Sequence, residues 1–278
     1  MHEIKADQSI ELLKELHILT RDGKMNQDSR RKIKQVNHLC QFIEPLLDEI
    51  RAEPAGHGDI RLVDHGAGKS YLGFILYDLY FKGLGDAGAG SHIYGIETRV
   101  ELVDKSRELA ARLGFAGMSF LNLSVEQSIA SDRLPAQVDI VTALHACNTA
   151  TDDAIRFALA KQARFIVLVP CCQAEVAAAL RKNKSKALAS PISEVWRHPL
   201  HTREFGSHVT NVLRCLQLEA HGYQVSVTEL VGWEHSMKNE LIIARYKDLP
   251  RRRPAERLHE LLQALGLEEL EARFFTTP

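Results

Sequence analysis

The sequence predicts an α/β fold with a mostly parallel sheet of about seven strands, one of them antiparallel. Two observations lead to this expectation. From residue 60 onward, short apolar runs alternate with helical segments, as in a parallel sheet. Only about ten residues, Val231–Glu240, connect the last two expected strands, whereas a parallel crossover needs a dozen or more residues and usually a helix. We therefore expect the last strand pair to be antiparallel.

The expected strands lie at 60–64, 92–97, 118–122, 138–144, 165–169, 223–230 and 241–246. The first five are separated by segments with helical spacing at 70–82, 99–113 and 151–162, and a further such segment follows at 173–182. No internal repeat is visible.

Three regions are expected along the chain. Residues 1–57 carry apolar side chains at three- and four-residue steps, which predicts helices, one of them beginning near Asp28. Residues 58–249 form the α/β domain, in which 183–210 has little periodicity and is expected to be a long loop above the carboxyl edge of the sheet. Residues 250–278 return to helical spacing and predict an amphipathic helix.

Composition places the chain among ordinary globular proteins. Of its 278 residues, 45% are hydrophobic and 26% are charged, which excludes collagenous, low-complexity and wholly disordered classes. The formal net charge is -1, so no global field draws the chain to nucleic acid or to anionic lipid. The longest apolar runs, Val138–Leu144 and Phe165–Pro170, fall far short of the roughly 18 residues that a membrane span needs.

The N-terminus and the cysteines bear on the compartment. Met1–Lys5 carries mixed charges and lacks the apolar stretch of a secretory signal. The five cysteines are scattered and odd in number, unlike a disulfide framework. We expect reduced thiols in a cytoplasmic protein.

A glycine turn follows the first expected strand. Asp64-His-Gly-Ala-Gly-Lys-Ser-Tyr-Leu72 combines a strand end, a turn and a helix start, where glycines let backbone N–H groups approach a ligand and the helix N-terminus favours an anionic group. A Walker loop needs a glycine where Val63 stands, and the dinucleotide fingerprint needs one at Tyr71. The pattern therefore disfavours an ATPase and an NAD-binding enzyme.

Polar residues follow the next two strands. Glu97 ends the second strand, where an acidic side chain can accept hydrogen bonds from both hydroxyls of an adenosine ribose. The alternative is a surface carboxylate that complements the dipole of the next helix. Ser124 and Val125 follow the third strand and are weaker candidates for ligand contacts.

Four segments, in this order, resemble one family: Asp64–Leu72, Tyr94–Glu97, Ala143–Asp152 and Val169–Gln173. Together they are similar to the class I S-adenosylmethionine-dependent methyltransferase domain, in the family that includes the glutathione S-transferase C-terminal-domain-containing protein. The third segment and the double cysteine also resemble the tRNA 2'-O-methyltransferases that act on the acceptor stem. The resemblance covers roughly residues 30–247.

This resemblance implies a Rossmann-like fold with one antiparallel strand near the end of the sheet, an N-terminal helical lid, and S-adenosylmethionine as cofactor. The implied cofactor-binding residues are Asp64, Gly66, Ala67, Gly68, Glu97, Ser124, Val125 and Leu144. Asp64 is implied to fix the turn and the amino group of the cofactor, Glu97 to hold the ribose, and Ser124 and Val125 to contact adenine. Ser70 departs from the pattern, because many such enzymes place a further glycine there.

The candidate catalytic residues are His145, Asn148 and Cys171, which follow the fourth and fifth strands. His145 can act as a general base, or it can be a loop histidine that shapes the pocket. Cys171 can be a covalent nucleophile only if its pKa is lowered; the alternative is a tightly packed turn. The adjacent Cys171 and Cys172 lack the spacing of structural zinc sites, so no metal is expected.

The candidate substrate-binding residues are Lys34, Trp233, His235, Lys238 and Asn239. Exposed aromatic rings such as Trp233 and His235 can stack on a base of single-stranded RNA; the alternative is a hydrophobic anchor with polar neighbours. Basic stretches lie at 30–34, 181–186 and 251–253, and such runs are also typical of solvated surfaces.

RNA is the first expected methyl acceptor, from the tRNA-family resemblance and the basic stretches. The near-zero net charge argues against a large nucleic-acid footprint. A protein or a small molecule is the alternative acceptor. A module that keeps the fold and binds cofactor or RNA without turnover is the alternative from another class, and an NAD-linked oxidoreductase comes third.

Overall fold

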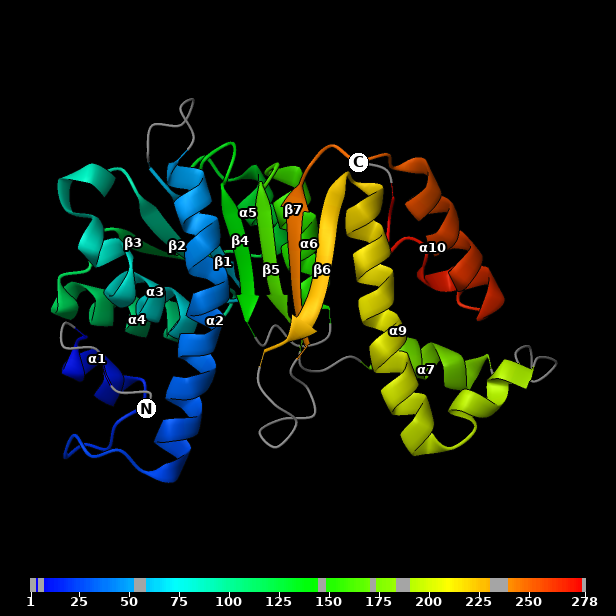
Figure 1. The fold of residues 1–278 in the computed structure, drawn as a ribbon, viewed down its shortest axis with the longest axis horizontal. Coiled ribbons are helices and arrows are strands. Elements are labelled where there is room, and N and C mark those ends of the chain that lie inside the picture. The colour runs from blue at the N-terminus through cyan, green and yellow to red at the C-terminus, as the bar shows by residue number, and fades with distance from the viewer. Residues whose placement is uncertain are drawn as a thin grey trace.

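A computed structural model describes residues 4, 8–52, 59–144, 149–170, 174–183, 191–230 and 240–276. Its centre is a seven-stranded sheet flanked by helices (Figure 1). The strands are β1 (Arg61–His65), β2 (His92–Glu97), β3 (Met118–Asn122), β4 (Ile140–Leu144), β5 (Phe165–Val169), β6 (Tyr223–Glu229) and β7 (Glu240–Tyr246). The helices are α1 (Ile10–Glu15), α2 (Gln27–Arg51), α3 (Tyr71–Leu79), α4 (Val100–Leu113), α5 (Val125–Ala130), α6 (Ala150–Ala160), α7 (Glu175–Lys182), α9 (Pro199–Ala220) and α10 (Arg252–Ala264). Short 3-10 segments are η1 (Phe81–Gly88), η2 (Pro191–Trp196) and η3 (Glu268–Leu270).

The strand order is β3-β2-β1-β4-β5-β7-β6. β7 pairs antiparallel with both β5 and β6, while the other neighbours are parallel. This confirms the predicted α/β class and the single antiparallel strand. The order reverses between β1 and β4, and in open α/β sheets a ligand binds at such a switch point, outside the carboxyl ends of the strands.

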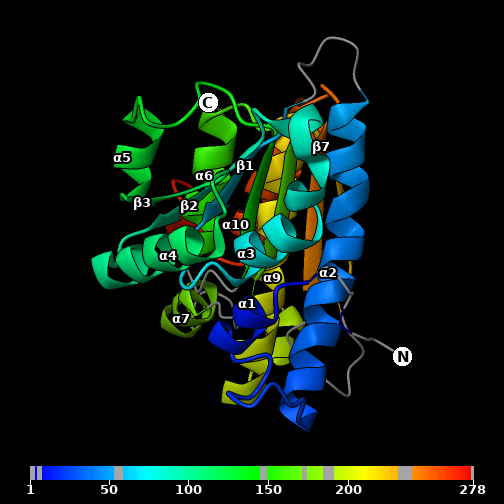
Figure 2. The same ribbon diagram turned by 90° about the vertical axis from the view of Figure 1, so that its left-hand side faces the viewer.

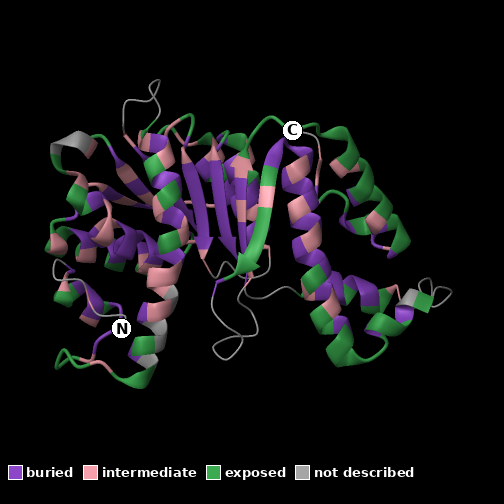
Figure 3. Ribbon diagram, in the orientation of Figure 1, coloured by how far each residue is buried: buried purple, intermediate pink, exposed green. Residues whose placement is uncertain are grey.

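Helices cover both faces of the sheet, with α2 on one side and α5 and α6 on the other (Figure 2). On the α2 side, residues such as Leu47, Leu62 and Phe74 form one hydrophobic cluster. On the α6 side, Val63, Val141 and Phe157 belong to a second cluster. The central strands β4 and β5 are almost entirely buried, whereas the edge strand β6 is largely exposed (Figure 3). Alternate residues of β1 therefore serve both cores, as a sheet covered on both faces requires.

Helix α2 begins close to the predicted position. Asn26 caps it, and its side-chain oxygen accepts a hydrogen bond from the Ser29 N–H at 2.8 Å. Such a cap satisfies one of the backbone N–H groups that have no partner inside the helix. Apolar residues of α2, including Leu39, Ile43 and Leu47, then pack on the sheet.

The prediction of a loop over 183–210 is wrong for the second half of that range. Residues 184–190 lie outside the described residues, but η2 follows and α9 begins at Pro199, inside the range expected to be a loop. A proline at the first helical position costs no hydrogen bond and presets the backbone angle, so Pro199 starts the helix instead of prolonging a loop.

Helices α7, α9 and α10 form a third hydrophobic cluster beside the β6 edge of the sheet, with Trp196, Leu213 and Leu258 among its buried members. The predicted C-terminal amphipathic helix is present as α10, and it packs on α9. In the described part of the chain, no helix is long and apolar enough to cross a membrane.

Candidate cofactor site

A cavity of about 430 Å³ opens at the carboxyl ends of β1 and β4. Asp64, the glycine turn and Leu144 line one part of it, and Arg99 adds a charged side chain. Ile18, Val36 and Leu39 of the N-terminal segment line another part. Helix α2 and the segment that follows α1 therefore line this cavity, and their role as a lid stays a prediction. Its volume lies within the range of about 300–1,000 Å³ that small-molecule sites occupy.

The turn between β1 and α3 is built on left-handed backbone angles. Gly66 and Gly68 have φ of 68° and 59°, which a residue with a side chain adopts at a cost. The Ala67 N–H donates a hydrogen bond to the carbonyl of Ile96 at 2.9 Å, which holds the turn against β2. The glycines and Ala67 predicted to bind cofactor thus form one wall of the cavity.

Ser70, which replaces the glycine of many related enzymes, also lies in the left-handed region, with φ of 50°. Its side chain is fully buried, and its hydroxyl donates to Asp64 Oδ2 at 3.3 Å. A left-handed non-glycine residue costs roughly 1–2 kcal/mol. The hydrogen bond to Asp64 offsets part of that cost, so this departure from the pattern adds a contact that glycine cannot make.

Asp64 is held from two sides. Besides Ser70, Thr142 of β4 donates its hydroxyl hydrogen to Asp64 Oδ1 at 3.0 Å. Asp64 and Thr142 are register partners in the sheet, which brings together residues 78 positions apart. Burial raises the pKa of Asp64 to about 6, although both hydrogen bonds lower it. Thr142 is not among the predicted site residues, because its only signal in the sequence is a lone hydroxyl in an apolar strand.

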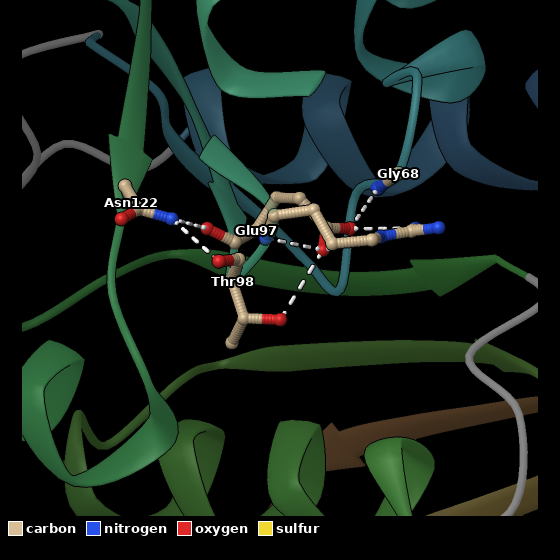
Figure 4. A network of polar contacts seen from close by, with 5 residues as sticks. Gly68, Glu97, Thr98 and Asn122 are labelled. Carbon is tan, nitrogen blue, oxygen red and sulfur yellow. Dashed lines mark hydrogen bonds and ion pairs between the residues drawn. The ribbon is translucent and has the colours of Figure 1, made fainter. Parts of the chain in front are cut away.

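Glu97 lies at the end of β2 and faces the glycine turn (Figure 4). Its Oε2 accepts a hydrogen bond from the Gly68 N–H at 2.8 Å, and its Oε1 accepts one from the Arg99 N–H at 3.0 Å. The Arg99 guanidinium also contacts both oxygens, at 3.0 and 3.2 Å. Burial raises the pKa of Glu97, but the hydrogen bonds from Arg99 and Gly68 outweigh burial and lower the pKa to about 2. Glu97 is therefore ionised and fixed beside the turn.

The backbone that carries Glu97 is also fixed. Asn122, at the end of β3, donates to the carbonyl oxygens of Glu97 and Thr98 at 3.0 and 2.7 Å (Figure 4). Glu97 and Asn122 are register partners, so these bonds connect two neighbouring strand ends. An ionised carboxylate held in this way can accept hydrogen bonds from a vicinal diol such as that of ribose.

Ser124 and Val125 follow β3 along the same edge. The Ser124 hydroxyl accepts a hydrogen bond from the Gln127 N–H, while the Gln127 side chain accepts one from the Ser124 N–H; together they form a capping box at the start of α5. Val125 is buried. Their contacts with adenine remain predictions, and Ser124 has a structural role as well.

His65 is buried directly after Asp64, and neither of its ring nitrogens has a hydrogen-bond partner. Its ring lies 5.3 Å from that of Phe157 in α6, centroid to centroid. Burial lowers the pKa of His65 to about 4, so the imidazole is neutral at physiological pH. The sequence analysis did not single out His65.

The predicted catalytic residues His145, Asn148 and Cys171 lie outside the described residues, as do the predicted substrate residues Trp233, His235, Lys238 and Asn239. The strand ends that precede the catalytic candidates are described: Leu144 and Val169 are register partners in neighbouring parallel strands. Lys34 is half-buried on α2, two residues before the cavity residue Val36.

A buried ionic chain lies behind this edge. Asp152 lies inside the first turn of α6, where both its oxygens accept hydrogen bonds from the Arg214 guanidinium at 2.7 and 3.0 Å. Arg214 also donates to Asn211, whose amide donates to Glu240 at 2.6 Å. This chain joins α6, α9 and the start of β7. In the described part of the chain, no group of three or more His, Cys, Asp or Glu side chains is placed to hold a metal ion.

Comparison with known proteins agrees with this geometry. Residues 31–179, more than half of the chain, match the family model described as a methyltransferase domain. The glutathione S-transferase C-terminal domain-containing protein of Bos taurus is 25% identical over 248 residues, which cover 80% of this chain and 34% of that protein. Its Drosophila melanogaster homolog is 24% identical, over 78% of this chain and 37% of that protein. The chain thus spans about a third of the length of these relatives.

A similar solved structure is that of magnesium protoporphyrin IX methyltransferase from Synechocystis with bound S-adenosylhomocysteine, at a TM-score of 0.46 and 15% identity, covering 86% of this chain and 96% of that one. The strand order, the carboxyl-edge cavity and the family match agree with one another. This chain belongs to the methyltransferase domain family, whose members take S-adenosylmethionine as the methyl donor.

Proposed function

We propose that the protein transfers the methyl group of S-adenosylmethionine to an RNA acceptor at the carboxyl edge of its sheet. The observation that carries the cofactor half of the proposal is the cavity where the Asp64–Gly68 turn faces the ionised Glu97. In this arrangement Glu97 holds the ribose hydroxyls, the turn admits the methionine part, and Asp64 binds the amino group.

The residues present fit such a cofactor. Glu97 is fixed by the Gly68 N–H on one oxygen and by the Arg99 N–H on the other. Each carboxylate oxygen has two lone pairs, and the Thr98 hydroxyl also donates to Oε1 at 3.3 Å. Acceptor capacity for two hydroxyls therefore remains once the exposed Arg99 side chain moves aside and the Thr98 hydroxyl turns away. The apolar residues Val36, Leu39 and Leu144 exclude water from the rest of the cavity.

Methyl transfer from a sulfonium is a direct displacement that needs no covalent intermediate with the protein. The chain's own contribution is to align the acceptor atom and to accept its proton; positioning alone can supply several kcal/mol. We assign alignment and proton transfer to His145, Asn148 and Cys171, because each follows β4 or β5, whose paired ends border the cavity at Leu144. His145 then acts as the general base.

Positive charge at the mouth of the cavity supports an RNA acceptor. The exposed side chains of Lys69 and Arg99 line it, and α2 adds the exposed Arg30 and the half-buried Lys34. Lysine and arginine contacts with phosphates supply the sequence-independent part of RNA binding. In this proposal Trp233, His235, Lys238 and Asn239 bind the acceptor nucleotide, and the protein acts in the cytoplasm.

The test is methyl transfer from labelled S-adenosylmethionine to RNA, protein and small-molecule fractions of a cell extract. We expect label in RNA, abolished by ribonuclease and falling steeply with added salt. His145→Ala should remove the label while leaving cofactor affinity within about twofold. Label only in protein or in small molecules would refute RNA as the acceptor. Cofactor binding without transfer to any fraction would instead establish a binding module.

A further inference from the structure

A second cavity, of about 830 Å³, lies at the opposite edge of the sheet. Tyr223 and Tyr246, the first residue of β6 and the last of β7, line it and are register partners. Arg164, directly before β5, lines it as well. Since β5 ends at the carboxyl edge and spans five residues at roughly 3.3 Å each, about 13–16 Å of sheet separates this cavity from the cofactor cavity. It is therefore a separate site, and nothing in the proposed methyl transfer uses it.

The lining of this amino-edge cavity is basic. Among the described residues, the lining includes Arg156, Arg164 and Arg251 and no carboxylate. Each arginine is also paired with a carboxylate outside the lining: Arg156 with Glu126 at 3.1 Å, Arg164 with Glu49 at 3.1 Å and Arg251 with Asp248 at 2.9 Å. A guanidinium carries five N–H donors, and such contacts engage one of its nitrogens. Planar guanidinium groups bind phosphate and carboxylate in pairs of hydrogen bonds, so the lining is suited to an anion.

The same cavity is aromatic. Tyr223, Tyr246, Phe275 and His221 line it. The two tyrosine rings meet edge to face with centroids 5.3 Å apart, and Phe275 meets His221 in the same way at 5.5 Å. Bases stack favourably on such rings. A flat ring attached to the anion therefore fits this lining better than an inorganic ion alone.

His221 adds a requirement for a hydrogen-bond donor. It is more than nine-tenths buried, and its Nδ1 lies 2.8 Å from the carbonyl oxygen of Gln217, so Nδ1 carries the proton. Burial lowers the pKa of this imidazole, and Arg251 lowers it further, which leaves Nε2 as an acceptor. Nε2 has no hydrogen-bond partner. A buried acceptor without a partner is destabilising, and a hydrogen bond from a ligand N–H removes that penalty.

We infer that the amino-edge cavity is a second ligand site, which binds a nucleoside monophosphate. The arginines hold the phosphate, the aromatic residues hold the base, and an N–H of the base donates to His221 Nε2. This inference stands independently of the methyl acceptor, because it rests only on residues of the opposite edge.

The experiment is calorimetric titration of the full chain with adenosine 5'-monophosphate, with S-adenosylhomocysteine present in excess to fill the cofactor cavity. We expect one nucleotide per chain, bound at micromolar to low millimolar concentration. Arg156→Gln and Arg251→Gln should each weaken binding at least tenfold. Arg253→Gln is the matched control, because Arg253 is exposed, follows Arg251 by two residues and is not part of the lining; it should change affinity less than twofold.

Two further measurements distinguish the contribution of the base to binding from that of the phosphate. Inorganic phosphate should bind at least tenfold more weakly than the nucleotide. His221→Phe should weaken the nucleotide at least threefold and leave phosphate unchanged, with thermal unfolding checked for every variant. Any one of four results would overturn the inference. The first two are no binding of the nucleotide at concentrations up to 10-fold above the millimolar range, and an affinity for phosphate equal to that for the nucleotide. The other two are displacement of the nucleotide by S-adenosylhomocysteine, and an affinity that Arg156→Gln and Arg251→Gln leave unchanged.

Discussion

Replacing Glu97 by alanine tests the central assignment of the cofactor site. The side chain is 8% exposed and ionised, and it is held by the N–H groups of Gly68 and Arg99 at 2.8 and 3.0 Å, so its position is set before any ligand arrives. A hydrogen bond to a charged group contributes about 1.5–3 kcal/mol. Losing one such bond to the ribose raises Kd by about 10- to 150-fold, at 1.4 kcal/mol per factor of ten.

Arg99→Ala is the matched control for this experiment. It leaves the carboxylate and its Thr98 and backbone donors in place and removes only the Arg99 guanidinium, whose side chain is 59% exposed. Exposed ion pairs contribute at most about 1 kcal/mol, so Arg99→Ala should shift Kd by less than about fivefold. The assay is calorimetric titration with S-adenosylmethionine and S-adenosylhomocysteine, with thermal unfolding measured for both variants. A folded Glu97→Ala protein with unchanged affinity would refute the ribose assignment.

Five further predictions follow from the same structure. Cofactor affinity should fall as pH drops through about 6, because Asp64 then loses its charge; this pH dependence, measured by titration, should be absent in Asp64→Asn. Folding raises the pKa of Asp64 from 3.8 to about 6, so the wild-type protein should lose about 3 kcal/mol of unfolding free energy relative to Asp64→Asn as pH rises from 4 through 6. Urea unfolding at a series of pH values measures this. A difference between the two proteins that does not change with pH would contradict it. Ser70→Ala should be about 1 kcal/mol less stable than Ser70→Gly, because both lose the bond to Asp64 but only glycine relieves the left-handed backbone; equal unfolding midpoints would contradict it. Arg214→Met should cost about 3–5 kcal/mol of unfolding free energy, since it leaves Asp152 charged and buried, and Arg214→Met combined with Asp152→Leu should recover much of that loss. Gly206→Ala should cost about 1–3 kcal/mol in the same assay, because its Cβ would come within 2.7 Å of the Ala177 backbone and push α7 from α9.

Local pattern alone determined much of this protein. Strand β2, for example, follows an apolar run with the predicted bounds, because strand formation depends on the alternation of neighbouring residues. The short connection between β6 and β7 determined that these two strands pair antiparallel, since it has too few residues for the crossover that a parallel pair needs. The glycine turn and Glu97 could be predicted as site residues for two reasons. The turn is a motif of residues a few positions apart, and the carboxyl ends of parallel strands must lie at one edge of the sheet.

Tertiary structure decided the partners. Thr142 contacts Asp64 because β1 and β4 are neighbours in register, an order that no local pattern encodes. Arg214 contacts Asp152, which lies 62 residues earlier in the chain. Helix α9 extends back to Pro199 because packing against α7 and α10 in a separate apolar cluster stabilises a helix there. Periodicity reports which face of an element is apolar, whereas burial, register and charge pairing depend on which distant element covers that face. For the same reason, the amino-edge cavity became visible only once the ends of β6 and β7 and the start of β5 were placed together.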